Sequence, residues 1–297
     1  MDCGYFTDRE EFGARQGAPS FSAFGSGGDI ELLLAPTSAA AFAEAVRALR
    51  LGGERFEVLG RATNVLFPDC RTEGAVLSTG GLRGEEVRGG TVWLAAGEKL
   101  GAAAQRAQKR GLSGLENIAS VPGSIGGAIA MNAGAYGREI CELVEYVDVI
   151  SDGKTARLSP QECGFGYRSS VFGKDTIVIG AALKLVQASP YDVAESMREF
   201  KRRRTASQPS GRSLGSVFRR AEGTSAGWFV ERAGFKGARA GGAEVSRKHA
   251  NFIVNRGGAT SADFVELMER VRDGVKAYCG TELVPEVVIL RGSQILH

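Results

Sequence analysis

One glycine-rich segment, residues 111–137, constrains the fold of this 297-residue chain more than any other part. The segment is apolar enough to be buried, yet it holds repeated glycines and one proline, which argues against an ordinary helix or strand. Buried irregular backbone needs hydrogen-bonding partners, and glycine lets backbone approach a ligand closely. Successive main-chain N–H groups can cradle a diphosphate. The segment therefore predicts a nucleotide-type cofactor, with a glycine-rich packing loop as the alternative.

The composition is that of an ordinary soluble enzyme, with 43% hydrophobic and 24% charged residues. No run approaches the roughly 18 to 20 apolar residues of a membrane span, and the acidic, polar N-terminus lacks the apolar core of a secretory signal. We therefore expect a cytoplasmic protein without membrane insertion. The net charge of +3 does not indicate nucleic acid. The basic run 201–204 favours a solvated helix end, with attraction of an anionic substrate as an alternative.

The cysteines are odd in number and scattered, without a C-x-x-C pair, so neither a disulfide framework nor a zinc site is predicted. We expect reduced, mostly buried thiols. Only two histidines, His249 and His297, are present, which excludes a histidine-based metal cluster and leaves few candidates for a covalent link to a flavin. The cysteines are Cys3, Cys70, Cys141, Cys163 and Cys279.

Short strand patterns alternate with a few helix patterns, which predicts an α+β cofactor domain ending near Gln187. A Pro/Gly/Ser-rich linker around Pro209 then marks a domain boundary or mobile loop. Asp152-Gly153 predicts a hairpin turn, and Ser261 is a plausible cap of the last helix. The expected strands are 30–35, 55–59, 75–78, 92–95, 143–150, 176–186 and 283–290. The expected helices are 38–50, 99–110, 191–204, 225–233 and 260–278.

The order of residues in the central segment closely resembles the flavin-binding segment of the UDP-N-acetylenolpyruvoylglucosamine reductase (MurB) family. Four further motifs, in family order, extend the resemblance over nearly the whole chain: the glycine loop 60–66, the Y-R-x-S pattern at 167–170, G-S-V-F at 215–218 and P-E-V at 285–287. The matching residues of the central segment are Asn117, Ser120, Pro122, Gly123, Gly126, Gly127, Asn132, Gly134, Ala135, Tyr136 and Gly137.

The chain departs from the family pattern at four places. Gly25 and Ser26 stand where arginine and isoleucine are usual, and Arg61 and Ala62 replace glycines. The pair Arg219-Arg220 replaces Lys-Asn, and Val288 replaces an arginine. The departure at Arg219-Arg220 affects the contacts expected with substrate there.

The resemblance implies an α+β fold with a two-part FAD-binding domain of the vanillyl-alcohol-oxidase (PCMH-like) type and a C-terminal α+β substrate-binding domain. Residues 1–70, joined by the C-terminal strand 283–297, would form the first FAD-binding subdomain. Residues 71–188 would form the second, and residues 189–282 the substrate-binding domain. The compact length resembles the shorter type II members, and a monomer is expected.

The function implied by the resemblance is that of an FAD-dependent UDP-N-acetylmuramate dehydrogenase of peptidoglycan synthesis. It would reduce UDP-N-acetylglucosamine enolpyruvate to UDP-N-acetylmuramate with noncovalent FAD and NADPH. Hydride would pass from flavin N5 to C3 of the substrate, and Ser216 would protonate C2. Arg168 would bind the substrate carboxylate, and Glu286 would hydrogen-bond the developing enol.

Each of the three catalytic candidates also has a plainer interpretation. Arg168 could be a surface ion-pair partner, Ser216 a turn or helix-cap serine, and Glu286 an outward-facing strand residue. By resemblance, the cofactor-binding residues are Gly60, Arg61, Ala62, Thr63, Asn64, Ser120, Pro122, Gly123, Gly126, Gly127, Asn132, Gly134, Ala135 and Tyr136. The substrate-binding residues are Tyr167, Arg168, Ser216, Arg220, His249 and Asn251, and no metal is expected.

Two other functions remain open from the sequence. A flavin oxidase of small alcohols or sugars would keep the fold, but the motifs at Ser216 and Glu286 argue against it. A non-enzymatic nucleotide-binding or scaffold protein would fit the departures at Gly25, Arg61 and Val288. Flavin binding, and the agent that reoxidises the flavin, would separate the three.

Overall fold

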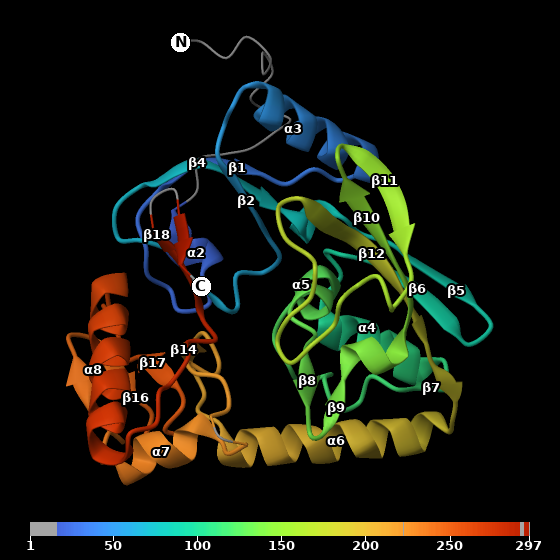
Figure 1. Ribbon diagram of the computed structural model, residues 1–297. Coiled ribbons are helices and arrows are strands. Elements are labelled where there is room, and N and C mark those ends of the chain that lie inside the picture. The colour runs from blue at the N-terminus through green and yellow to red at the C-terminus, as the bar shows by residue number, and fades with distance from the viewer. Residues whose placement is uncertain (1–16, 222, 292–293, 297) are drawn as a thin grey trace. The chain divides into compact units, whose positions relative to one another are not determined.

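The computed structural model describes residues 17–221, 223–291 and 294–296 (Figure 1). Cys3, His297 and the N-terminal residues that were examined for a secretory signal lie outside this range. The described chain divides into two compact units. Unit 1 holds residues 32–61 and 74–204, and unit 2 holds residues 17–31, 62–73 and the described residues from 205 onward.

A five-stranded antiparallel sheet is the centre of unit 1. Asp152 and Gly153 join two of its strands in a tight turn with φ of 49° and 72°, as Asp-Gly predicts. The strand after this turn was not predicted, because its side chains are all exposed or half-buried and show no alternation. In sheet order the strands are β11 (Lys154–Leu158), β10 (Val144–Ser151), β12 (Thr176–Lys184), β6 (Thr91–Ala95) and β5 (Glu85–Arg88).

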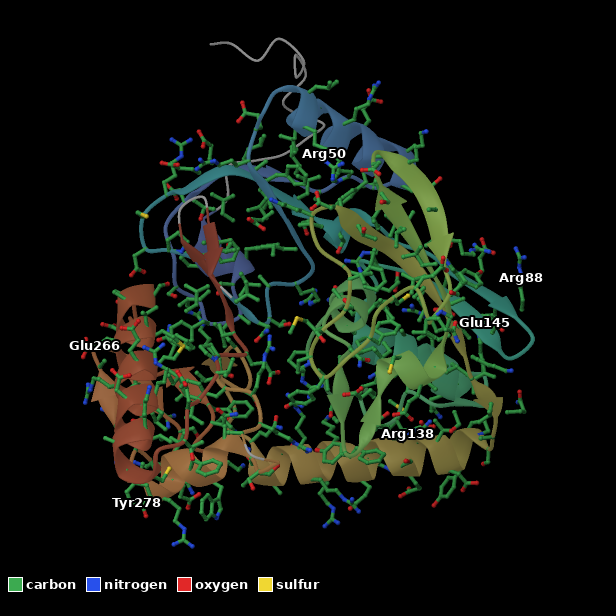
Figure 2. The ribbon with its side chains drawn as sticks, viewed as in Figure 1. Arg50, Arg88, Arg138, Glu145, Glu266 and Tyr278 are labelled. Carbon is green, nitrogen blue, oxygen red and sulfur yellow. The ribbon has the colours of Figure 1, made fainter. Side chains whose placement is uncertain are left out.

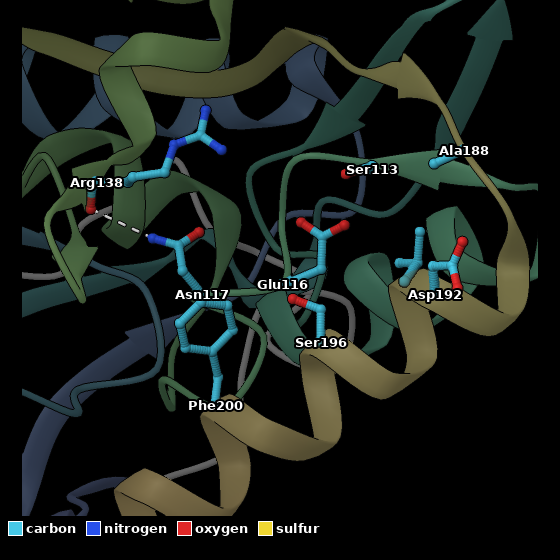
Figure 3. A pocket seen from close by; sticks show the side chains of 9 residues that line it. Ser113, Glu116, Asn117, Arg138, Ala188, Asp192, Ser196 and Phe200 are labelled. Carbon is cyan, nitrogen blue, oxygen red and sulfur yellow. Dashed lines mark hydrogen bonds between the residues drawn. The ribbon is translucent and has the colours of Figure 1, made fainter.

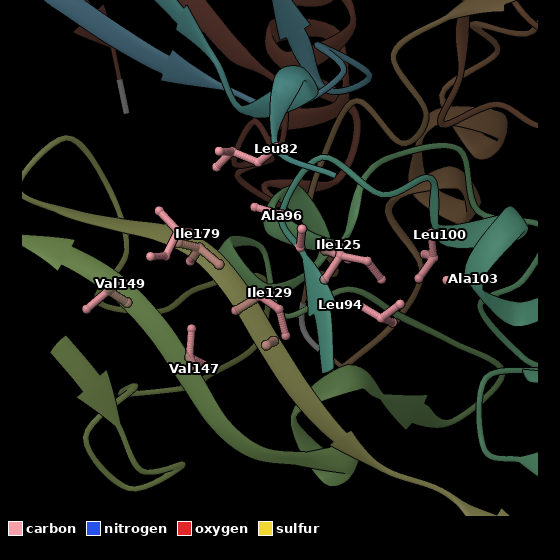
Figure 4. Packing of buried hydrophobic residues seen from close by; sticks show 14 of the residues in the cluster. Leu82, Leu94, Ala96, Leu100, Ala103, Ile125, Ile129, Val147, Val149 and Ile179 are labelled. Carbon is pink, nitrogen blue, oxygen red and sulfur yellow. The ribbon is translucent and has the colours of Figure 1, made fainter. Parts of the chain in front are cut away.

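Two helices, α4 (Leu100–Lys109) and α5 (Ile125–Ala130), contribute buried side chains to the core that this sheet forms. Figure 4 shows Leu94 of β6, Val147 of β10 and Ile129 of α5 within this cluster. Helix α4 ends before Gly111, as predicted. Helix α5 corrects the expectation that the central segment is wholly irregular, since tertiary packing overrides the low helix propensity of its two glycines.

A second sheet has three strands, with parallel pairing of β2 and β4. The helix that follows its first strand begins where predicted, because the Ser38 Oγ accepts the N–H of Ala41 at 3.1 Å. The elements are β1 (Ile30–Leu34), β4 (Thr72–Ser78), β2 (Phe56–Leu59) and α3 (Ala39–Leu51). Short elements of unit 1 are η1 (Thr79–Gly81), β7 (Leu112–Ser113), β8 (Gly134–Ala135), β9 (Arg138–Glu139), η2 (Ile140–Leu143) and β13 (Val186–Gln187).

Unit 2 packs a four-stranded sheet and the long helix α8 (Ser261–Cys279) around a core that contains Phe24, Phe264 and Leu267. The cap of α8 differs from the prediction: Thr260 is the N-cap and forms a capping box with Asp263, and Ser261 is the first helical residue. The sheet order is β14 (Arg212–Ser213), β17 (Ile253–Asn255), β16 (Ala243–Val245) and β15 (Arg239–Ala240).

The C-terminal part of unit 2 pairs with the last residues of the glycine loop. Strand β18 (Val288–Arg291) pairs in parallel with β3 (Val65–Leu66) and antiparallel with β19 (Gln294–Leu296). The remaining elements are α2 (Ala18–Phe21), α6 (Pro190–Ser207) and α7 (Ala226–Arg232). Figure 2 shows long charged side chains on the outer faces, such as Arg88 on β5 and Glu266 on α8.

The described cysteines are free thiols, but the expectation that most are buried is wrong, because only one of the four is buried. Cys70 and Cys279 are exposed, whereas Cys163 is buried, and burial raises the pKa of its thiol to about 11. Among the described residues, no three His, Cys, Asp or Glu side chains gather as a metal site would require. None of the described helices has the length and apolarity of a membrane span.

Candidate flavin and substrate site

The central segment of unit 1 is held by the main chain of residues 96–100. The N–H of Gly126 donates to Ala96 O at 2.8 Å, and the N–H of Ile125 donates to Glu98 O at 2.9 Å. A Cβ at Gly126 would lie 2.8 Å from Ala96 Cβ, and a Cβ at Gly60 would lie 2.5 Å from Ser124 Oγ. Only glycine permits these approaches. The structure thus brings the glycine loop and the central segment together through Gly60 and Ser124.

Backbone in the left-handed region gathers at predicted site residues. Among the described residues, five non-glycine positions have positive φ, and four of them are predicted site residues: Ala62, Asn132, Tyr136 and Arg168, at 41° to 56°. The fifth is the hairpin residue Asp152. Such conformations cost about 1–3 kcal/mol each and concentrate at ligand and catalytic sites. Their positions support a ligand site along these segments.

A bound cofactor would also account for an unsatisfied polar atom. The Ser120 Oγ is buried and has no hydrogen-bond partner among the described residues, although buried hydroxyls are normally bonded. Ser120 lies in the predicted flavin-binding segment, just before Pro122 and Gly123. The unsatisfied hydroxyl of Ser120, the close backbone approaches at Gly60 and Gly126, and the residues in the left-handed region fit a nucleotide cofactor such as FAD.

Asn132 ties the central segment to the turn that carries Arg168. Its Nδ2 donates to Gly166 O at 3.0 Å and to Glu139 Oε2 at 2.7 Å, and its Oδ1 accepts the N–H of Cys141 at 3.2 Å. Asn132 is 1% exposed, so its amide serves the scaffold.

Arg168 lies on a turn closed by two hydrogen bonds between Gly166 and Ser169. Its Nη2 donates to Gly134 O at 2.9 Å and its Nη1 to Asn132 O at 3.4 Å. Its guanidinium carbon is 5.1 Å from the centre of the Tyr167 ring. These contacts place Arg168 directly beside the predicted flavin-binding segment and hold a half-buried cation there.

Tyr136 packs against helix α6. Its hydroxyl donates to Phe200 O at 3.2 Å, and the two ring centres are 4.9 Å apart. The side chain of Asn117 donates to Ala135 O at 2.9 Å and to Arg138 O at 3.3 Å, which fixes the same hairpin. The ring of Tyr136 is therefore occupied by α6, and its predicted role as a cofactor contact stays untested.

In unit 2, main-chain hydrogen bonds join the segments that carry Ser216 and Glu286. The N–H of Glu286 donates to Val217 O at 2.8 Å, and the N–H of Arg219 donates to Val284 O at 2.9 Å. These are neighbouring antiparallel segments, linked also by a bridge between Phe218 and Pro285. Both Ser216 and Glu286 are half-buried.

Asn64, at the end of the glycine loop, contacts the Glu286 segment. Its Nδ2 donates to Glu286 O at 2.9 Å, and its main-chain O accepts the N–H of Val288 at 3.0 Å. The glycine loop thus supports the strand that carries the carboxylate, a contact that the sequence did not predict. Thr63 is half-buried and Arg61 exposed, and their predicted cofactor contacts stay predictions.

His249 and Asn251 lie in one turn beside the Ser216 segment. Burial lowers the pKa of His249 below its usual value, and nearby Lys236 lowers it further. The Nδ1 of His249 accepts the N–H of Asn251 at 3.2 Å, which requires an unprotonated Nδ1. The Asn251 amide bonds the main chain of Phe218 on both sides. Both residues therefore have partners within the protein.

Sequence reasoning assigned no role to Arg219, but the structure singles it out. The Arg219 Nε is buried and has no partner among the described residues. Arg219 lies three residues after Ser216 in the sequence. The neighbouring Arg220 is exposed. The G-S-V-F-R-R run contained this signal, because an arginine so close to a predicted catalytic serine is suited to an anionic substrate.

A cavity of about 280 Å³ lies in unit 1 between the segment 113–117, Arg138 and helix α6 (Figure 3). Its most buried acidic side chain, Glu116, is 8% exposed and accepts the N–H of Gly114 at 2.8 Å. None of the predicted cofactor-binding or substrate-binding residues lines this cavity. It adjoins the predicted site, because its lining residues Asn117 and Phe200 contact the predicted cofactor-binding residues Ala135 and Tyr136.

Two family profiles match the chain in succession. Residues 30–159 match the FAD binding domain family, and residues 207–290 match the family described as UDP-N-acetylenolpyruvoylglucosamine reductase, C-terminal domain. Together they cover the segments that carry the five motifs, except the Y-R-x-S turn.

Relatives match over most of the chain. The UDP-N-acetylenolpyruvoylglucosamine reductase of Rubrobacter xylanophilus is 39% identical over 276 residues, which cover 91% of this chain and 92% of the relative. The protein of the same name from Gloeobacter violaceus is 41% identical over 275 residues, covering 91% and 93%.

The crystal structure of UDP-N-acetylenolpyruvylglucosamine reductase (MurB) from Thermus caldophilus matches with a TM-score of 0.81 and 32% identity, covering 94% of this chain and 98% of that chain. The predicted fold class, α+β with a two-part FAD-binding domain of the vanillyl-alcohol-oxidase type and a C-terminal α+β domain, is confirmed.

Proposed function

Because this chain belongs to the UDP-N-acetylenolpyruvoylglucosamine reductase family, we propose that it reduces UDP-N-acetylglucosamine enolpyruvate to UDP-N-acetylmuramate in peptidoglycan synthesis. It is an FAD-dependent oxidoreductase. NADPH is the proposed reductant, and a cytoplasmic monomer the proposed form. The proposed domains keep the predicted boundaries, 1–70 with 283–297, 71–188 and 189–282.

The observation that carries the proposal is the pairing of the Ser216 and Glu286 segments within unit 2. A hydroxyl and a carboxylate from residues 70 positions apart in sequence lie on segments joined by direct main-chain hydrogen bonds. This arrangement supports a shared task for the two side chains. The plainer interpretation of Ser216 as a helix cap fits less well, because Ser216 does not precede a helix.

Bound FAD would supply the hydride chemistry of this reaction. The protein must then stabilise negative charge that develops at the substrate carboxylate and deliver a proton to C2. Arg168 suits the first task, because a guanidinium stays cationic and binds a carboxylate through two parallel hydrogen bonds. We propose that Glu286 hydrogen-bonds the developing enol and that Ser216 donates the proton. A serine does this only toward a strongly basic carbon held in close geometry.

Arg168 belongs to unit 1, and Ser216 and Glu286 belong to unit 2. Their action on one substrate follows from the family resemblance. The proposed cofactor-binding residues are those predicted from the sequence: Gly60, Arg61, Ala62, Thr63, Asn64, Ser120, Pro122, Gly123, Gly126, Gly127, Asn132, Gly134, Ala135 and Tyr136. Tyr167, Arg220 and His249 are proposed to bind substrate.

The test of this function is an absorbance spectrum under anaerobic conditions. A flavin band that bleaches on addition of NADPH and returns only with the enolpyruvyl nucleotide is the expected result. Recovery in air alone, with hydrogen peroxide formed, would indicate an oxidase. A protein that lacks the band and takes up no added FAD would contradict the proposal.

Substitution of the proposed proton donor separates the two half-reactions. Ser216→Ala is expected to keep flavin reduction by NADPH and to slow reoxidation by the enolpyruvyl nucleotide about 10²- to 10⁴-fold, the usual contribution of general acid catalysis. Stopped-flow absorbance measures both steps. The exposed serine Ser210 is the matched control, and Ser210→Ala is expected to alter neither step. Equal loss in both half-reactions of Ser216→Ala would indicate a folding defect instead.

A further inference from the structure

The Asn251 amide binds the peptide backbone beside Ser216 on two sides. Its Oδ1 accepts the N–H of Phe218 at 3.0 Å, and its Nδ2 donates to Phe218 O at 2.8 Å. The main-chain O of Asn251 also accepts the N–H of Val217 at 2.8 Å. One residue therefore supplies three hydrogen bonds to the two residues that directly follow Ser216.

The peptide group between Val217 and Phe218 connects this amide to Glu286. Its N–H donates to Asn251 Oδ1, and its C=O accepts the N–H of Glu286 at 2.8 Å. A peptide group is planar and rigid, so a shift at the Asn251 end moves the acceptor of the Glu286 N–H. The same residue thus bonds the backbone next to Ser216 and is linked through one peptide plane to the N–H of Glu286.

Burial makes these bonds hard to replace. Asn251 is 5% exposed, Val217 1% and Phe218 2%, so water has little access to groups left without a partner. A buried main-chain N–H without a partner carries the full cost of its desolvation. Only a side chain with a donor and an acceptor at the same branch can bond both groups of Phe218. The amide of Asn251 meets this requirement, with its two polar atoms 3.0 and 2.8 Å from the N and O atoms of Phe218.

We propose that Asn251 is a positioning residue that sets Ser216 and Glu286 relative to each other for proton delivery. Its amide acts on the backbone of the Ser216 segment, in place of the direct substrate contact expected from the sequence. The inference rests on the proposed function, because it takes Ser216 as the proton donor. It adds a residue that determines the rate of that step without touching substrate.

Asn255 provides a matched control on the same stretch of chain. Its Nδ2 donates to Phe24 O at 2.9 Å, and its Oδ1 accepts the N–H groups of Gly257 and Ala259. It therefore also bridges backbone groups of unit 2, but none of those bonds involves residues 216–218 or 286. Loss of the Asn255 amide should lower the stability of the fold without specifically slowing the proton-delivery step.

The experiment measures the two half-reactions by anaerobic stopped flow in FAD-loaded variants. Asn251→Ala is expected to slow reoxidation by the enolpyruvyl nucleotide about 100-fold, the scale of a displacement near 1 Å at a reacting group, with flavin reduction by NADPH unchanged. Asn251→Asp keeps the acceptor for the Phe218 N–H but replaces the donor to Phe218 O with a carboxylate oxygen. It should reproduce the effect with less change in packing, which keeps the test valid if the alanine variant does not fold. Asn255→Ala should slow neither half-reaction selectively.

The double variant distinguishes positioning from a general structural role. If Asn251 acts through Ser216, adding Asn251→Ala to Ser216→Ala should slow reoxidation by less than about threefold, because residues that act as a unit are not additive. Full multiplication of the two losses, or normal reoxidation in both Asn251 variants, would overturn the inference. A normal rate in Ser216→Ala alone would instead overturn the proposed proton donor.

Discussion

At the scale of single residues, Glu244 is a buried charge with two cationic partners. Its side chain is 2% exposed, its Oε1 accepts from Arg256 Nη2 at 2.8 Å, and its Oε2 accepts from Arg239 Nε at 2.6 Å. The hydrogen bond from Arg256 is the main cause of a pKa below the usual value; burial opposes it, and Arg239 adds to it. The charged carboxylate therefore stabilises β16 within the sheet of unit 2.

This pairing predicts a pH dependence of stability. Because the folded state holds the Glu244 carboxyl at a lower pKa than the unfolded chain does, its stabilisation is present above the ordinary carboxyl pKa and is lost as pH falls through the folded value. Glu244→Gln is expected to lower the free energy of unfolding by about 1–3 kcal/mol near pH 7, with a smaller loss in acid. Urea unfolding at several pH values measures it.

The control for this prediction is Glu266→Gln on α8. Glu266 is an exposed carboxylate, 3.3 Å from Arg270, and exposed pairs contribute about 0–1 kcal/mol. It should change stability little at any pH. If Glu244→Gln behaves like Glu266→Gln, the ion pairs of Glu244 do not stabilise the fold.

Motif context singles out individual residues in the sequence, but it does not indicate which side chains bond the backbone. Arg168, Ser216 and Glu286 stand out because of their neighbours in sequence. Asn251 acts on Phe218, 33 positions away, through main-chain groups that every residue carries, so no side-chain pattern could indicate the contact. Arg219 had a signal in the sequence, its closeness to Ser216, but only the structure shows that its buried Nε lacks a partner among the described residues.

At the scale of elements, local signals located α3 and α4 to within a residue or two, because a cap or a terminal glycine marks each of them. Helix α5 escaped prediction for a physical reason. Its sequence, IGGAIA, has low intrinsic helix propensity, and a helix of 6 residues depends on tertiary packing. Ile125 and Ile129, both fully buried, supply that packing.

The contact between α5 and β6 gives a prediction for Gly126. Alanine favours a helix by up to about 1 kcal/mol over glycine, yet a Cβ at Gly126 would lie 2.8 Å from Ala96 Cβ and 3.2 Å from Ala96 O. Overpacking of this kind costs about 1–3 kcal/mol. Gly126→Ala is therefore expected to lower the free energy of unfolding of the FAD-free protein, measured by urea titration.

Gly127→Ala separates packing from cofactor contact. The nearest atom to a Cβ at Gly127 is Ser124 Oγ, at an ordinary 3.5 Å, so this variant should be at least as stable as the parent without FAD. Weaker FAD binding by Gly127→Ala at unchanged stability would support the proposed cofactor contact. Greater destabilisation by Gly127→Ala than by Gly126→Ala would contradict the packing argument.

At the scale of the whole molecule, the sequence could not reveal how the chain is divided. The predicted domains are consecutive stretches apart from the C-terminal strand, whereas each compact unit combines separate stretches. Residues 62–73 belong to the unit that contains residues 205 onward, and β3 pairs with β18, more than 200 positions later. Such pairings leave no trace in local composition, and only the family resemblance led us to expect that the strand 283–297 joins residues 1–70. The predicted domain boundaries remain a prediction.

Two hydrophobic clusters with no shared residue stabilise the described chain, one in each unit. Leu94 of β6, 1% exposed, belongs to the first, and Leu267 of α8, 0% exposed, to the second. A Leu→Ala change at either site is expected to lower the free energy of unfolding by about 2–5 kcal/mol. Because Leu94 lies two residues before Ala96, which holds Gly126, Leu94→Ala should also disturb the proposed FAD site.

Leu94→Ala is therefore expected to weaken FAD binding at least about tenfold, a loss of roughly 1.4 kcal/mol in binding free energy, whereas Leu267→Ala should leave it nearly unchanged. Fluorescence titration of the FAD-free variants measures the affinity, and urea unfolding confirms that the two lesions are of similar size. The comparison uses the same chemical change at equal burial, so a difference in affinity shows that FAD binding depends mainly on the core of unit 1. Equal weakening would contradict this prediction and would mean that FAD binding depends as much on the core of unit 2, to which the proposed contacts Ala62, Thr63 and Asn64 belong.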